Sequence, residues 1–114
     1  MSRQSVIDSM IAFALEELAS GSEARRRGLV RHLCLRWPEA PALSVVFAMT
    51  SAAATLEDNI RRNADATNAA PLAYRLAAIL AADIYAVESM GQKPATAEDL
   101  LHFWRRVDSY FLDI

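Results

Sequence analysis

The chain has 114 residues, 54% of them hydrophobic, and a net charge of −2. This balance argues against the broad basic surface of a non-specific nucleic-acid binder, and the length predicts a single helical domain over residues 1–114. The N-terminal apolar stretch contains Asp8, Glu16 and Glu17, which a secretory signal would lack, and the lone Cys34 fits a reducing compartment. We therefore expect a cytoplasmic protein with no membrane partner.

Helical spacing of apolar residues predicts an all-α fold, a compact bundle of about five helices at residues 5–19, 23–36, 42–63, 70–90 and 96–113. Gly21 ends the first helix, and Ser22 can cap the second. The second must end near Trp37, because Pro38 disfavours helical geometry in the residue before it. Pro41 suits the first turn of the third helix.

The segment at 70–90 is apolar on nearly every side, so we expect neighbouring helices to shield it on at least two sides. One stripe consists of Leu72, Leu76, Ile79, Val87 and Met90. A second face carries Tyr74, Ala78, Ala81 and Tyr85. The third helix has a strip of small residues, Ala48, Ala52 and Thr55, and the fourth has matching Ala77, Ala78, Ala81 and Ala82. These strips predict an antiparallel hairpin of the two helices, joined by residues 64–70.

Thr96 and Asp99 resemble a capping box that opens the last helix. Its predicted core stripe consists of Leu100, Trp104, Val107, Phe111 and Ile114. So much apolar surface must dock on the domain or on a partner, because it would aggregate if left in water.

Asp83 lies inside the apolar stripe of the fourth helix, between Ile79 and Val87. A buried carboxylate needs a partner or takes up a proton. The favoured interpretation is a hydrogen bond to a Tyr, Trp, Thr or Arg on a neighbouring helix. The alternatives are a small-molecule pocket formed with Tyr85, and an Asp at the end of the core or in a subunit contact.

The second predicted helix is rich in arginine, with Glu23 as its one acidic residue; its arginines are Arg25, Arg26, Arg27, Arg31 and Arg36. Cations in a first turn oppose the helix dipole, so a negative group should lie nearby. The favoured interpretation is that Glu16 and Glu17 fold back across the turn and neutralise them. An acidic protein partner or nucleic-acid phosphate, bound by Arg27, Arg31 and Arg36, is the alternative.

No catalytic, metal or cofactor site is predicted. His32 and Cys34 stand two residues apart on a helix, so they point to nearly opposite faces and cannot share one ion. Cys34 falls on an apolar face, where cysteine is usually inert. An enzyme is therefore less favoured than a non-catalytic protein.

Three functions remain open. The first is protein–protein interaction or self-association as a homodimer, through a patch on the third or the last helix. The second, less favoured, is a DNA-associated regulator that uses the arginine-rich second helix. The third is a small-molecule-binding helical bundle with Asp83 facing a cavity.

Overall fold

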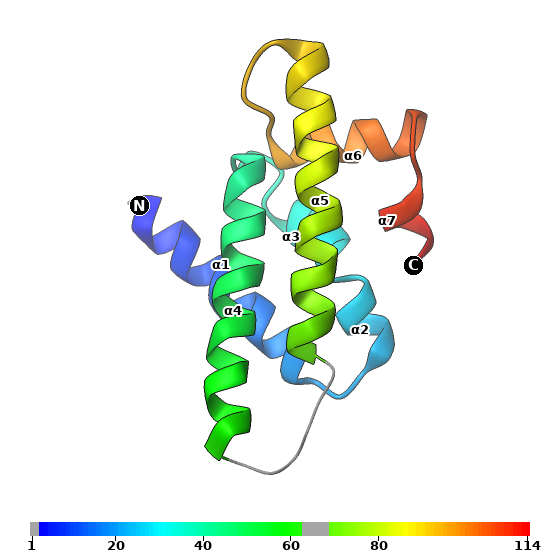
Figure 1. Ribbon diagram of the computed structural model, residues 1–114. Helices are drawn as coiled ribbons and strands as arrows, with labels where there is room; N and C mark the ends of the chain where they lie inside the picture. Colours follow the sequence, from blue (N-terminus) through cyan, green and yellow to red (C-terminus); the bar gives the residue numbers. More distant parts are fainter. Residues whose placement is uncertain (1–2, 63–68) are drawn as a thin grey trace.

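The computed structural model describes residues 3–62 and 69–114, and these ranges fold into helices without strands (Figure 1). The predicted all-α bundle is confirmed. The helices are α1 (Arg3–Ala19), α2 (Glu23–Arg27), α3 (Leu29–Arg36), α4 (Ala42–Arg62), α5 (Ala69–Gly91), α6 (Ala97–Arg106) and α7 (Tyr110–Asp113).

The second predicted helix is kinked at Gly28 into α2 and α3. The Gly28 amide donates to the Ala24 carbonyl at 3.0 Å, and its own carbonyl accepts from the His32 amide at 2.9 Å, so the chain stays nearly helical there. A Cβ atom at Gly28 would lie 2.8 Å from Cε1 of His32. Glycine therefore gives the His32 ring the space it occupies.

The last predicted helix is also divided, because α6 ends at Arg106 and a short turn precedes α7. The Asp108 carboxylate accepts from the amide of Tyr110 at 3.1 Å. Asp and Ser side chains compete with helical backbone bonds in this way, and the sequence places both at this turn. Trp104 and Phe111 are buried as predicted, whereas Val107 is exposed.

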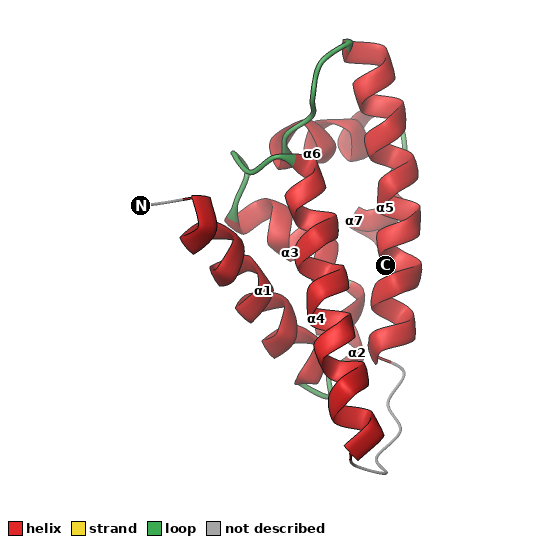
Figure 2. Ribbon diagram, turned by 60° about the vertical axis from the view of Figure 1, so that its left-hand side comes forward, coloured by secondary structure: helices red, strands yellow, loops and turns green. Residues whose placement is uncertain are grey.

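The antiparallel hairpin of α4 and α5 is present, and the two helices lie side by side in both views (Figures 1 and 2). Alanines are buried on both helices, namely Ala48, Ala52 and Ala53 on α4 and Ala69, Ala70, Ala73 and Ala77 on α5. Both strips predicted for this contact are correct only in part, because Thr55 on α4 and Ala78, Ala81 and Ala82 on α5 are exposed. Most of the predicted link, residues 64–68, lies outside the described residues.

The expectation that α5 is shielded on both its faces is wrong. Its buried face runs along Ala73, Leu76, Leu80 and Ile84, while Tyr74 and Tyr85 stand exposed on the other face. The molecule measures 45 × 33 × 19 Å, and 19 Å is about the thickness of two packed helices. The molecule is therefore about two helices thick, and the other helices cover α5 from one side only.

The length and composition of α5 would also allow it to cross a membrane, because an 18-residue segment of this helix has a mean hydropathy of 1.4. Only 33% of that segment is buried inside the molecule. The core helix of a soluble protein can have the same length and composition, so this is weak evidence for a membrane span.

Two loops join at the start of α4 and α6. The amide of Ala42 donates to the carbonyl of Ala95, and the amide of Ala97 donates to the carbonyl of Ala40, both at 2.8 Å. The capping box predicted at Thr96 and Asp99 is confirmed, with both reciprocal bonds present. These contacts fix the N-terminus of α6 against the hairpin.

Candidate functional site

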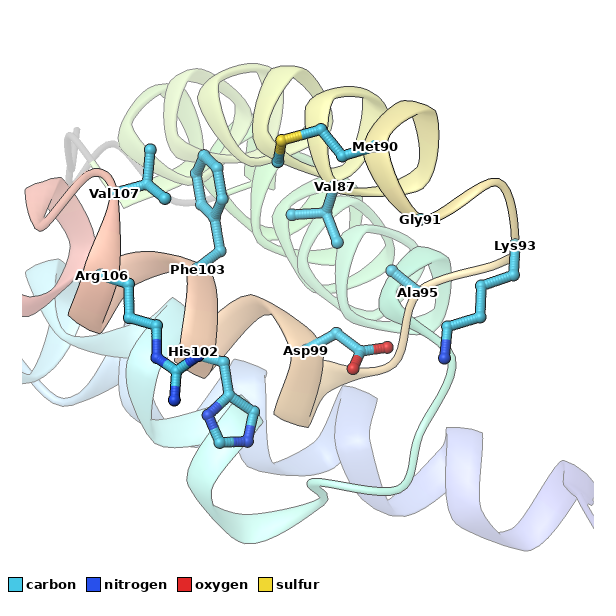
Figure 3. A pocket seen from close by; sticks show the side chains of 10 residues that line it. All are labelled: Val87, Met90, Gly91, Lys93, Ala95, Asp99, His102, Phe103, Arg106 and Val107. Atoms are coloured by element: carbon cyan, nitrogen blue, oxygen red, sulfur yellow. The ribbon is translucent and has the colours of Figure 1, made fainter.

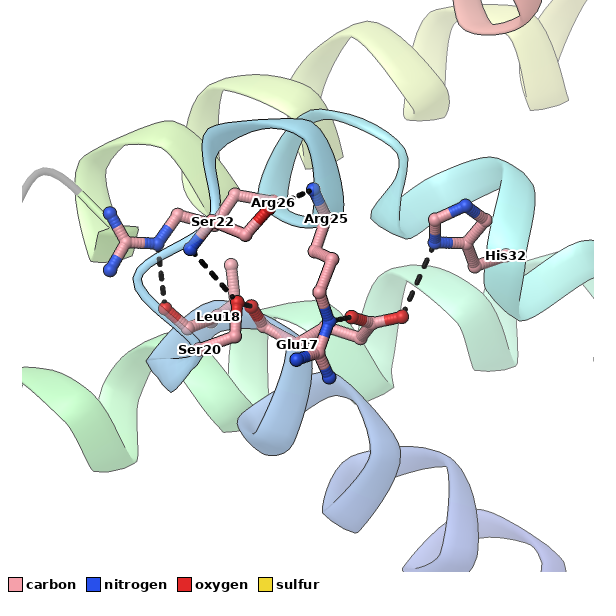
Figure 4. Close-up of polar contacts among 7 residues, drawn as sticks. All are labelled: Glu17, Leu18, Ser20, Ser22, Arg25, Arg26 and His32. Carbon is pink, nitrogen blue, oxygen red and sulfur yellow. Dashed lines mark hydrogen bonds and ion pairs between the residues drawn. The ribbon is translucent and has the colours of Figure 1, made fainter.

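The arginine-rich turn is held together by a buried carboxylate (Figure 4). Oε2 of Glu17 accepts from Nε of Arg25 at 2.5 Å, and Oε1 lies 3.3 Å from Nδ1 of His32. Arg26 donates from Nε to the carbonyl of Leu18 at 2.8 Å. The predicted neutralisation across the turn is therefore confirmed for Glu17, while Glu16 is exposed and takes no part in these contacts.

The three arginines predicted to bind a partner each have a contact within the protein. Arg27 pairs with Glu23 at 3.2 Å, one helical turn away. Arg31 donates from Nη1 to the carbonyl of Leu112 at 2.9 Å, which ties α3 to α7. The Arg36 guanidinium lies 5.2 Å from the ring centroid of Trp37. Their role in binding an acidic protein or DNA stays a prediction.

Asp83 has the neighbour that the favoured interpretation required. Nε1 of Trp104 donates to Oδ2 of Asp83 at 2.9 Å. Partial burial raises the pKa of Asp83, the bond from Trp104 lowers it in part, and the nearby charge of Asp108 raises it. Tyr85 is 76% exposed and lies two residues further along α5, which places it on a different side of the helix. A pocket formed by Asp83 and Tyr85 together stays a hypothesis.

The most unusual surface is the solvent-exposed side of the hairpin, which we call the outer hairpin face. It is formed by Leu43, Phe47, Thr50 and Ala54 on α4 and by Tyr74, Ala78, Ala81 and Tyr85 on α5. Both sets repeat at spacings of three or four residues, so each forms one line along its helix. All eight side chains are exposed except Thr50, which is partly buried.

Charged side chains are missing from the middle of this face. Residues 42–56 contain no charged residue, although α4 exposes one side over this length. On α5, Arg75 is the only charged residue from 71 to 82. A surface helix normally presents charged residues to water, so the outer hairpin face has the composition of a covered surface.

The apolar surface continues from α4 over the N-terminal part of α1. A shallow hollow of about 550 Å³ is lined by Ile7, Pro41, Leu43 and Phe47. A neighbouring hollow of about 410 Å³ shares Ile7 and Pro41 and reaches Trp37. The exposed apolar area is thus larger than the two helical lines alone.

Sequence reasoning did not identify Leu43 and Phe47 as members of this surface. The sequence does contain one indication of this surface, the absence of charged residues from 40 to 56. An ordinary surface helix of this length would carry charged residues on the side that faces water. The four α5 residues were recognised as an apolar face, but we expected them to be buried.

Comparison with known proteins gave no relative: no protein-family model, curated protein or solved structure matches this chain. The chemistry of its own surface therefore carries the functional interpretation.

Proposed function

We propose that this protein acts through protein–protein interaction in the cytoplasm, and that its partner is a second copy bound through the outer hairpin face. The exposed face of α4 and α5, which is uncharged in its middle, is the observation that carries this proposal. At one end of the face the Tyr74 hydroxyl donates to the Glu57 carboxylate at 2.5 Å. A two-fold axis through the face would place each helical line against the same surface of the other copy.

The large side chains on this face supply the driving force. Phe47 is 52% exposed and Leu43 is 69% exposed. Burying such a side chain fully contributes about 1.5 to 3 kcal/mol. In a symmetric contact the same side chain is buried in both copies, so the contribution is counted once for each copy. Ala78 and Ala81 between the tyrosines leave room for a partner helix to approach closely.

The outer hairpin face is smaller than a standard dimer contact. From Leu43 to Ala54, α4 rises about 17 Å. Two adjacent helices are about 20 Å wide, which gives a footprint of roughly 340 Å² before side-chain relief is counted. Standard interfaces bury ~800 Å² per partner, so the proposed contact also needs the apolar extension over α1.

The last helix is a weaker candidate for this contact. Its largest side chains, Trp104 and Phe111, are buried within the molecule, and their ring centroids lie 5.0 Å apart. Val107 remains exposed, but its neighbours Arg105 and Arg106 are charged.

Sedimentation velocity across micromolar concentrations tests the proposal. We expect the wild-type protein to reach twice the chain mass of 12.6 kDa. Phe47→Glu should produce a monomer, because the carboxylate would be desolvated in the contact. Leu35→Glu is the matched control, because Leu35 on α3 is 53% exposed but belongs neither to the outer hairpin face nor to the lining of the two hollows beside it. A monomeric wild type, or equal effects of both substitutions, would refute the proposal.

A further inference from the structure

One end of the outer hairpin face is acidic. The α4 line of the face ends at Ala54, and Glu57 continues this line one helical turn later. The Tyr74 hydroxyl of α5 donates to Oε1 of Glu57 at 2.5 Å, so the carboxylate is held against a ring that belongs to the face. Asp58 follows in the sequence, and both acidic residues are exposed.

The carboxylates at this end have no paired cation among the side chains that the structure describes. Glu57 and Asp58 form no ion pair there, and neither does Arg75, the residue after Tyr74 on α5. The hydrogen bond to Glu57 is the main cause that raises the pKa of Tyr74, and the charges of Glu57 and Asp58 add to it. No described charge on α1 or α3 acts on this hydroxyl. Tyr74 therefore keeps its proton near neutral pH and remains the donor to Glu57.

A second copy that covers this end of the face would remove water from Glu57. Tyr74 and Ala54 both belong to the proposed contact, and the carboxylate is bonded to one and lies a helical turn from the other. Removal from water disfavours the charged form of a carboxylate, which takes up a proton where no cation pairs with it. A symmetric contact contains two such carboxylates, so the effect is present in both copies.

We propose that self-association of this protein takes up protons at Glu57, so that the dimer is tighter in mild acid than at neutral pH. The inference rests on the proposed function, because it requires a second copy on the outer hairpin face. Its sign follows from linkage: a fall in pH favours the side of an equilibrium that binds more protons. Protonated Glu57 has no charge to desolvate, and its carbonyl oxygen can still accept from Tyr74.

The other exposed apolar surface does not have this arrangement. It is a groove of about 340 Å³ between the end of α5 and α6, flanked by Met90 and Val107, which are 67% and 69% exposed (Figure 3). Its carboxylate, Asp99, lies between Lys93 at one end of the groove and Arg106 at the other. A contact through this groove would therefore cover both signs of charge, and we expect no comparable proton uptake there.

Dissociation constants of the dimer, measured by sedimentation velocity at pH 7 and pH 5, test the inference. For the wild type we expect the Kd to fall about fivefold over this range, as two carboxylates that each bind a proton about tenfold more tightly in the dimer would produce. Glu57→Gln keeps an acceptor for Tyr74 and should associate more tightly than the wild type at pH 7, with little response to pH. Glu98→Gln is the matched control, since it removes the same charge from an exposed residue on α6 and should keep the fivefold response.

Equal responses of the Glu57 and Glu98 variants to pH would overturn the inference. So would a wild-type dimer that weakens in acid, because Glu57 would then pair with a cation of the other copy. Both results leave a dimer in place and so spare the proposed function. A monomeric wild type at both pH values would refute the proposed function, and this inference with it.

Discussion

The indole Nε1 of Trp104 donates a hydrogen bond to Oδ2 of Asp83 at 2.9 Å. Trp104 is fully buried and also packs against Phe111, so one side chain connects α5, α6 and α7. This contact explains how a helix with so apolar a stripe tolerates a carboxylate within it.

Asp83 should make the stability of the protein depend on pH. Burial raises its pKa in the folded state above the ordinary 3.8. The folded protein therefore favours the protonated form of Asp83. The stability that this preference contributes is fully present below about pH 3.8, and it is lost as the pH rises through the pKa of Asp83 in the folded state. Asp83→Asn keeps an acceptor for Trp104 and cannot ionise. We expect urea unfolding to show the variant gaining stability relative to the wild type between pH 3.5 and 7; a constant difference would contradict this.

Removing the acceptor altogether should be harmful at every pH. Asp83→Ala leaves the buried Trp104 N–H without its partner, which costs about 1 to 3 kcal/mol. The free energy of unfolding measured in urea provides the test. The Asn variant is the control, and equal stabilities of the Ala and Asn variants would show that the hydrogen bond contributes nothing.

The ion pair of Glu17 and Arg25 should respond unequally to loss of its two members. The Glu17 side chain is 8% exposed and that of Arg25 is 46% exposed. Arg25→Ala leaves a buried carboxylate, whereas Glu17→Gln leaves an arginine that reaches water. We expect losses of about 2 and about 1 kcal/mol, respectively, in thermal or urea unfolding. The reverse order would show that the carboxylate is solvated in the folded protein.

Gly28 and His32 should be energetically coupled. Gly28→Ala improves helix propensity by about 1 kcal/mol, but its Cβ would lie 2.8 Å from the His32 ring. We expect the substitution to destabilise the wild type and to stabilise the His32→Ala variant. A double-mutant cycle measures the coupling. Additive effects would mean that the ring moves away without cost.

Cys34 should react only when the protein opens. Burial raises the pKa of its thiol to about 12, so almost no thiolate is present near neutral pH. With a disulfide reagent at pH 8, we expect modification roughly a hundredfold or more slower than in the urea-unfolded chain. A fast reaction that does not depend on urea would show that the thiol is accessible in the native state.

Local signals predicted helix ends well. The capping box at Thr96 and Asp99, the cap at Ser22 and the stop before Pro38 involve residues close in sequence, so their chemistry does not depend on the rest of the fold. The carboxylate partner of the second helix was also predictable, because a cationic first turn requires a nearby negative charge and Glu17 lies within reach of Arg25.

Which helix faces are covered was beyond sequence reasoning. Tyr74 and Tyr85 lie on an apolar face that a helical wheel identifies, but a wheel does not show which neighbours pack against it. The His32 ring occupies the space beside Gly28 and lies 3.3 Å from Glu17 on α1, and this contact between helices cannot be read from the sequence. The outer hairpin face is exposed because the neighbouring helices pack against α5 from one side only.

Intermolecular contacts measured by isotope-filtered NMR, on a mixture of labelled and unlabelled protein, test the central claim most directly. We predict contacts between copies from the rings of Phe47, Tyr74 and Tyr85 and from the methyl groups of Ala78 and Ala81. A spectrum without intermolecular contacts at millimolar concentration would contradict it, as would contacts confined to Met90 and Val107.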